Sequence, residues 1–323
     1  MGKVVVLGSL HMDVMVYAPD RPRKGETLRG SGWGLRCGGK GGNQAVQAAV
    51  HGAEVAMISR VGDDDFGQQL LANLRAAGVN TEAVLLDASA GSGMSVAIVD
   101  ETGDYGAVIV SGVNMHMDAA DIDRTLPLIQ AADVLVLQYE VPLETVALAA
   151  QAAASAGTQV VLNAAPAYPP PPGLLPYVDI LVVNEVEGEM LSGRTITDRE
   201  SALAIAEQLA QQVRAVILTL GGKGAIIATE GAIYHLPAYK VDVVDTHGAG
   251  DAFVGALASQ LSSGIPLSRA VRYASAAARS CARKLRLCQK KCRRCWRTRG
   301  ALRSHGTAQR SLYGLVKTQP SSV

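Results

Sequence analysis

The chain has 323 residues, of which 48% are hydrophobic, and its formal net charge is +1. This length fits one large α/β domain or two smaller ones, with enough apolar residues for a substantial core. No apolar run reaches the ~18 residues that a membrane-spanning helix needs. The opening stretch, Met1 to Gly8, is too short for a signal peptide. We therefore expect a cytoplasmic protein without a membrane partner.

The small net charge hides a sharp division near residue 279. Residues 1–278 contain all 29 acidic residues and 17 of the 30 basic ones, whereas residues 279–323 contain 13 basic residues and no acidic one. Cysteine follows the same division, since Cys37 stands alone in the first segment and four cysteines crowd the second. So abrupt a change indicates a folded body followed by a tail of different origin.

The first hundred residues predict strands and helices in turn. Val4–Leu7 has the pattern of a buried strand, whereas residues 13–36 form short alternating pieces broken by proline and glycine. Such pieces are typical of strands that lie over a core. The glycine-rich stretch 38–43 opens a helix with a small inward face, a strand follows at Val55–Ile58, and a helix follows at 66–77.

Met94–Val99 and Tyr105–Val110 flank a turn sequence and predict a hairpin. The chain then alternates regularly between apolar strands and amphipathic helices. The predicted elements are strands Val134–Leu137, Val160–Leu162, Ile180–Val183 and Ala215–Leu220, with helices Leu143–Ala156 and Ala202–Val213. This alternation indicates parallel β-α-β units of an α/β fold, in which ligands bind beyond the carboxyl ends of the strands.

The sequence from Asp245 to Asp251 predicts the start of another helix. Gly248 and Gly250 permit backbone conformations that other residues avoid, and the apolar spacing of a helix begins directly after them. The first N–H groups of a helix can bind a phosphate group. Asp251 in the first turn would then suit proton removal from a hydroxyl that attacks phosphorus. An ordinary loop before a capped helix fits the local pattern equally well.

Polar side chains recur where the predicted strands end. Each alone is usually solvated surface, but together at one edge of the sheet they predict a site. These residues are Asp13, Lys40, Asn43, Glu140, Asn184 and Glu187.

Six motifs in order resemble the ribokinase-like (PfkB-type) carbohydrate kinases. They occupy residues 38–45, 137–140, 162–167, 184–187, 219–224 and 245–251, so that the resemblance covers about residues 3–278. It implies a three-layer α/β/α fold with a central, mostly parallel sheet and a small β-sheet lid. The lid would comprise about residues 13–36 and 92–112, cover the sugar and pair two subunits as a homodimer.

The resemblance also implies an activity and roles for individual residues. The reaction would be ATP-dependent phosphorylation of ribose to ribose 5-phosphate, with Asp251 as general base and the N–H groups of Gly248, Ala249 and Gly250 binding the γ-phosphate. The implied sugar-binding residues are Asp13, His11, Gly39, Lys40, Asn43, Glu140 and Asp251. The implied nucleotide and metal residues are Asn184, Thr219, Gly221 and Gly224, Glu187 for Mg²⁺ through water, and Asp245 and His247 for K⁺ or another monovalent cation.

Two departures from the family pattern leave alternatives open. His11 stands where ribokinases usually carry Asn, so another pentose, a ketohexose or a nucleoside remains possible. The tail from Arg279 lacks the family's final loop and acidic helix. We interpret it as the product of a reading-frame shift near codon 279, the alternatives being a basic interaction tail for nucleic acid or anionic membrane, and a zinc site at Cys281, Cys288, Cys292 and Cys295.

A tail that is out of frame would remove half of the cation site and part of the nucleotide site. We then expect weak nucleotide binding and little activation by K⁺. The alternative function is a sugar-binding protein that no longer turns over.

Overall fold

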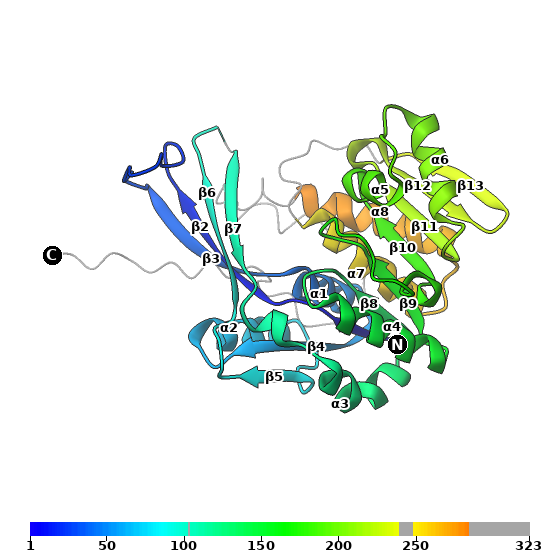
Figure 1. Cartoon of the computed structure of the whole chain (residues 1–323), viewed down its shortest axis with the longest axis horizontal. Coiled ribbons are helices and arrows are strands. Elements are labelled where there is room, and N and C mark those ends of the chain that lie inside the picture. The colour runs from blue at the N-terminus through cyan, green and yellow to red at the C-terminus, as the bar shows by residue number, and fades with distance from the viewer. Residues whose placement is uncertain (103, 239–247, 284–323) are drawn as a thin grey trace, which may run out of the picture.

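The computed structural model describes residues 1–102, 104–238 and 248–283. Its centre is a nine-stranded sheet in which β12 and β13 run antiparallel to their neighbours and the other strands are parallel (Figure 1). In spatial order the strands are β13 (Ala232–Leu236), β12 (Ala225–Thr229), β11 (Ala215–Thr219), β10 (Ile180–Val183), β9 (Gln159–Asn163), β8 (Val134–Leu137), β1 (Lys3–Leu7), β4 (Glu54–Gly62) and β5 (Val84–Asp87).

Helices cover both faces of this sheet because its strands are apolar on both sides. In β1, Val4 and Val6 enter one buried cluster, whereas Val5 and Leu7 enter the other. The first cluster includes side chains of α1 (Lys40–Val50), α2 (Asp65–Ala76), α7 (Ala249–Ser262) and α8 (Leu267–Arg283). The second cluster is covered by α3 (Ala119–Gln130), α4 (Leu143–Ala156), α5 (Glu185–Ser192) and α6 (Arg199–Leu209). The predicted three-layer α/β fold is confirmed.

A separate four-stranded sheet projects from one side of this body (Figure 1). Its spatial order is β3 (Gly32–Gly38), β2 (His11–Tyr17), β6 (Gly93–Val99) and β7 (Tyr105–Val110). The predicted hairpin is β6 and β7, which pair antiparallel. Asp13 lies inside β2, not directly after the first strand as predicted, because the chain re-enters extended structure at His11.

Two helix boundaries differ from the sequence prediction. Helix α6 runs over Arg199–Leu209, not Ala202–Val213, because Asp198 caps it by accepting a hydrogen bond from the Ser201 N–H. Helix α8 continues through Arg283, beyond the compositional break at residue 279. Within the described residues, none of the helices is both long and apolar enough to span a bilayer.

The small sheet joins the body through buried side-chain hydrogen bonds. Asn114, in the short 3-10 helix η1 (Gly112–His116), accepts from the Leu10 N–H at 2.9 Å and donates to the Leu10 and Ser111 carbonyls, each at 2.9 Å. Leu10 directly precedes β2, so Asn114 fixes the point where that strand leaves the body. Asp64 accepts from the Ser92 N–H at 2.7 Å and fixes the start of β6 in the same way.

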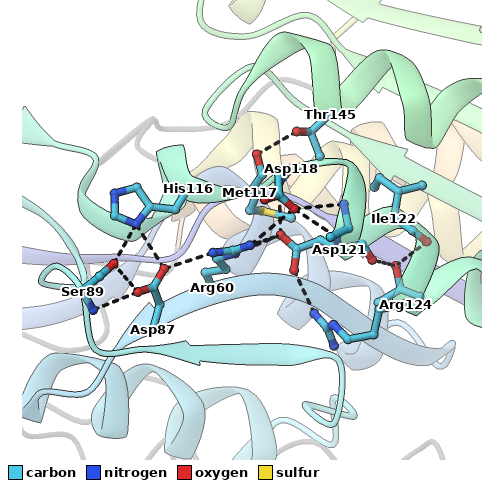
Figure 2. Close-up of polar contacts among 12 residues, drawn as sticks. Arg60, Asp87, Ser89, His116, Met117, Asp118, Asp121, Ile122, Arg124 and Thr145 are labelled. Atoms are coloured by element: carbon cyan, nitrogen blue, oxygen red, sulfur yellow. Dashed lines mark hydrogen bonds and ion pairs between the residues drawn. The ribbon is translucent and has the colours of Figure 1, made fainter.

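An ion-pair network links the edge of the large sheet to α3 (Figure 2). The Arg60 guanidinium lies 2.8 Å from Asp121 Oδ2 and 3.1 Å from Asp87 Oδ2. Asp121 also pairs with Arg124 at 3.1 Å, and His116 Nδ1 lies 3.1 Å from Asp87. Asp121 is only 2% exposed. Its carboxylate therefore depends on these arginines for the interactions that it loses with water.

Candidate active site

The site is built where α1 and α7 begin, beyond the carboxyl ends of the central strands. The two helices pack very closely, because a Cβ on Gly255 would lie 2.6 Å from the Gln44 carbonyl oxygen and 2.8 Å from the Ala48 N. The absence of a side chain at position 255 therefore lets α7 pack directly against α1. The starts of these two helices carry motifs that are more than 200 residues apart in the sequence.

Asp251 lies in the first turn of α7, as predicted, and its carboxylate faces α1. Its Oδ2 accepts from Asn43 Nδ2 at 3.0 Å, and its Oδ1 accepts from Gln44 Nε2 at 3.0 Å. Burial raises the pKa of the Asp251 carboxyl above its usual range, while the charge of Lys40 opposes this shift. A buried carboxylate with a raised pKa can accept a proton more readily than a solvated one.

A chain of buried amides lies behind Asp251 and was not assigned a role from the sequence. Gln44 Nε2 donates to Asn163 Oδ1 at 3.0 Å as well as to Asp251. Gln44 Oε1 accepts from Gln138 Nε2 at 2.7 Å. All three amides lie within motifs recognised in the sequence, but a buried glutamine gives no local pattern by which its function could be identified.

The amino end of α7 presents the first backbone N–H groups of a helix. Gly248 adopts the left-handed conformation at φ 75°, which favours glycine, and no side chain of the described residues caps this helix end. A Cβ on Gly250 would meet no atom within 4 Å among those described. The N–H groups of Ala249 and Gly250 lie in the same helical turn as Asp251, and the first N–H groups of a helix can bind an anion.

Glu140 joins the end of β8 to the loop before α1. Its Oε2 accepts from the Ser9 hydroxyl and, at 2.8 Å, from the Lys40 N–H. His11 Nδ1 lies 3.8 Å from the same oxygen. His11 is 4% exposed, and its Nε2 is buried without a hydrogen-bond partner among the described residues. These contacts place His11, Lys40 and Glu140 together, as the sequence predicted.

Asp13 lies on the small sheet. Its Oδ1 accepts from the Ser95 hydroxyl at 2.6 Å, and a Cβ on Gly38 would lie 2.2 Å from its Oδ2. Gly39 has φ 84°, and a Cβ there would lie 2.8 Å from both the His11 N and the Ser9 carbonyl oxygen. None of the described contacts joins Asp13 directly to Asp251.

Asn184 and Glu187 form the amino end of α5. Glu187 Oε2 accepts from the Asn184 N–H at 2.8 Å, Oε1 accepts from Asn184 Nδ2 at 2.9 Å, and the Glu187 N–H donates to Asn184 Oδ1 at 2.9 Å. Burial raises the pKa of the Glu187 carboxyl, and the charge of Lys40 opposes this shift. Asn184 directly follows β10, which runs parallel to β9, β8 and β1, so the start of α5 lies at the same edge of the sheet as Glu140.

The predicted nucleotide residues follow β11. Thr219 donates its hydroxyl to the Val183 carbonyl at 3.2 Å. Gly221 has φ 51° and Gly224 has φ 107°, and a Cβ on Gly224 would lie 2.1 Å from the Leu236 carbonyl oxygen. Glycine at position 224 is therefore required by the close approach of β13.

Several predicted residues lie outside the described part of the chain. They are Asp245, His247, and the tail cysteines Cys288, Cys292 and Cys295. Within the described part, no three His, Cys, Asp or Glu side chains group as metal ligands. Two cavities, of about 240 and 420 Å³, lie away from the site, one beside Leu28 and the other beside Asp179.

Comparison with known proteins supports the predicted family. The profile described as pfkB family carbohydrate kinase matches residues 1–290. A deoxyribokinase of Salmonella typhimurium is 37% identical over 259 residues, which are 79% of this chain and 84% of the relative. A ribokinase of Haemophilus influenzae is 35% identical over 276 residues, which are 85% of this chain and 90% of the relative. The structure of Arabidopsis thaliana ribokinase complexed with ribose and ATP has a TM-score of 0.81 at 30% identity, over 87% of this chain and 93% of that one.

Proposed function

The chain belongs to the pfkB family of carbohydrate kinases as a ribokinase-like sugar kinase, and from that premise we propose that it transfers the γ-phosphate of ATP to ribose, giving ribose 5-phosphate. The observation that carries the proposal is the Asp251 carboxylate, held by Asn43 and Gln44 in the first turn of α7, whose amino end has no side-chain cap among the described residues. A base and an anion site side by side are what phosphoryl transfer to a hydroxyl requires.

In this proposal Asp251 takes the proton from the attacking sugar hydroxyl as its oxygen forms a bond to phosphorus and the bond to ADP breaks. The N–H groups of Gly248, Ala249 and Gly250 stabilise the negative charge of the transferring phosphoryl group. Asp13, His11, Gly39, Lys40, Asn43 and Glu140 bind the sugar, while Asn184, Thr219, Gly221 and Gly224 bind the nucleotide. Closure of the small sheet over the sugar would exclude water, so that ATP is not hydrolysed.

We propose that Mg²⁺ accompanies ATP and contacts Glu187 through water. Both Glu187 carboxylate oxygens already accept hydrogen bonds from Asn184, which fits a metal that keeps its hydration shell better than direct coordination. When bound, the metal would neutralise the phosphates and orient the γ-phosphate. Asp245 and His247, proposed for the monovalent cation, lie outside the described residues.

Ribose and 2-deoxyribose are the two leading sugars, because a ribokinase and a deoxyribokinase are both similar to this chain over most of its length. The buried, unpaired Nε2 of His11 supports a sugar pocket that differs from one with Asn at this position. A 2-deoxy sugar lacks one hydroxyl of ribose. The preference between the two sugars therefore depends on whether the pocket has buried donors or acceptors that this hydroxyl would pair and that the 2-deoxy sugar would leave unpaired.

A coupled assay for ADP release, run beside sugar calorimetry, tests the function. We expect ADP release that depends on sugar and ATP, with ribose or 2-deoxyribose preferred in a panel of pentoses, ketohexoses and nucleosides. Sugar binding without ADP release would instead select the non-catalytic sugar-binding protein. Neither binding nor release across the panel would refute both functions.

We also propose that two chains pair through the small sheet. Its edge strand β7 exposes three consecutive apolar residues, with Val108 70%, Ile109 58% and Val110 53% exposed. Unpaired edge strands with apolar side chains favour pairing with another chain.

A further inference from the structure

The amides behind Asp251 have a fixed order of donors and acceptors. An ionised carboxylate can only accept hydrogen bonds, so Gln44 must turn its NH₂ group toward Asp251 Oδ1. Its carbonyl oxygen then faces away, toward Gln138, which must donate with Nε2. Both glutamines are 0% exposed, so bulk solvent does not reach either side chain. The orientation of each amide thus follows from the next one.

We propose that Gln44 and Gln138 are positioning residues, which hold the Asp251 carboxylate in one orientation through this directed chain of amides. None of the hydrogen bonds among the described residues joins Gln138 to Asp251, so Gln138 would act on it only through Gln44. The inference rests on the proposed function in one respect, the assignment of Asp251 as the general base.

The unpaired oxygen of Gln138 supports this order. Gln138 Oε1 is buried without a hydrogen-bond partner among the described residues, and a Cβ on Gly8 would lie 1.9 Å from it. Turning the Gln138 amide over would leave its NH₂ group unpaired and bring two carbonyl oxygens together at Gln44. One unpaired acceptor costs less than an unpaired donor combined with two opposed acceptors. The chain therefore keeps the orientation that directs the Gln44 donor to Asp251.

Among the described residues, the charged groups that act on Asp251 come from two other elements of the fold. Lys40, at the start of α1, favours the ionised carboxylate, whereas Glu140, after β8, disfavours it. The donors from Asn43 and Gln44 add to the effect of Lys40. Removal of the Gln44 donor leaves Lys40 and Glu140 in place. A change in the pH at which kcat falls on the acidic side would therefore measure the effect of the lost hydrogen bond on Asp251.

The experiment is a double-mutant cycle read on the pH dependence of kcat. Gln44→Met and Gln138→Met keep the side-chain length and remove the amide. We expect Gln44→Met to move the acidic midpoint upward by about 1 pH unit, the size of one hydrogen bond to a charged group. Gln138→Met moves it upward by less, and the double variant moves it no further than Gln44→Met does, because Gln138 acts through Gln44.

The matched control is Gln208→Met. Gln208 lies on α6, and this substitution removes a partly buried amide that donates to the Ser192 carbonyl and not to the residues around Asp251. Its midpoint should equal that of the unmodified protein. An unchanged midpoint in folded Gln44→Met would overturn the proposal that the chain of amides positions Asp251. Strictly additive shifts in the double variant would overturn it as well. If circular dichroism shows that Gln44→Met does not fold, Gln138→Met decides alone, since an unmoved midpoint there also overturns it.

Asp251→Asn distinguishes an error in the proposed roles of Gln44 and Gln138 from an error in the proposed function. If this variant keeps near-normal turnover, Asp251 is not the base and the proposed mechanism is wrong. If it loses turnover while Gln44→Met leaves the acidic midpoint of kcat unmoved, Asp251 remains the base and only the positioning roles of Gln44 and Gln138 are refuted.

Discussion

Asp251 concentrates the proposed chemistry in one side chain. We predict that Asp251→Asn lowers kcat by about 10²–10⁴-fold, the usual contribution of a general base, while sugar binding measured by calorimetry persists. The replacement has nearly the same shape, so the fold should be retained. Loss of sugar binding together with turnover would show that the substitution had damaged the site as a whole.

The same residue predicts how the rate depends on pH. The base works when ionised, and burial raises the pKa of Asp251 above the ordinary value of 3.8. The kcat should therefore be at its maximum above the raised pKa of Asp251 and should fall as the pH drops through that pKa. We expect the acidic midpoint of kcat above pH 3.8, measured with saturating ATP and sugar. A midpoint at or below that pH would contradict the assignment.

Arg60 has a structural role in the ion-pair network between the edge of the large sheet and α3 (Figure 2). We predict that Arg60→Ala lowers the free energy of unfolding by about 3 kcal/mol, because Asp121 then lies buried with Arg124 as its remaining cationic partner. Urea unfolding measures the change.

The control for Arg60 is Arg21→Ala, which removes a surface pairing with Asp104 at 2.7 Å. The Arg21 side chain is 45% exposed, so water screens this pair and its loss should leave the unfolding midpoint nearly unchanged. Equal effects of the two substitutions would show that burial of Asp121 is not what makes Arg60 important.

At the level of elements, the root of the small sheet determines where β2 stands. Asn114 satisfies both the N–H and the carbonyl of Leu10, one residue before β2. We predict that Asn114→Ala destabilises the protein by about 2–3 kcal/mol, since two buried backbone groups lose their partner. It should also raise the KM for sugar more than the KM for ATP, because Asp13 lies on β2.

Steady-state kinetics with each substrate varied in turn measures that difference. Asn80→Ala is the matched control, because the Asn80 side chain is exposed and accepts a hydrogen bond from the nearby Glu82 N–H. A sugar KM equal to that of the unmodified protein would mean that the position of β2 does not depend on Asn114.

Which elements form could be predicted from the sequence, whereas how they meet could not. Alternating apolar strands and amphipathic helices indicated the parallel sheet, and Gly248 and Gly250 indicated the start of α7. The contact of α7 with α1 depends on Gly255, whose missing side chain has no meaning until both helices are placed. Gln138 was likewise invisible, because its role depends on the orientation of the Gln44 amide.

The predicted roles differ in how far the structure supports them. Asn43 and Asp251 share a hydrogen bond, and Lys40 influences the pKa of both Asp251 and Glu187, so these four residues belong to one site. Asp13 lies on the small sheet, where it accepts a hydrogen bond from the Ser95 hydroxyl, and the described hydrogen bonds do not join it to these four residues.

On the scale of the whole molecule, the exposed edge of the small sheet predicts the oligomeric state. We expect the protein to sediment as a dimer and Ile109→Lys to sediment as a monomer, because the edge strand β7 would then carry a charge into the apolar contact. Leu148→Lys is the control, since Leu148 is 40% exposed on α4, outside the small sheet, and its substitution should leave the dimer intact. Analytical ultracentrifugation at micromolar concentration measures all three proteins. A monomeric unmodified protein would show that the proposed dimer does not form. A dimer that survives Ile109→Lys would show that the two chains pair elsewhere than at β7.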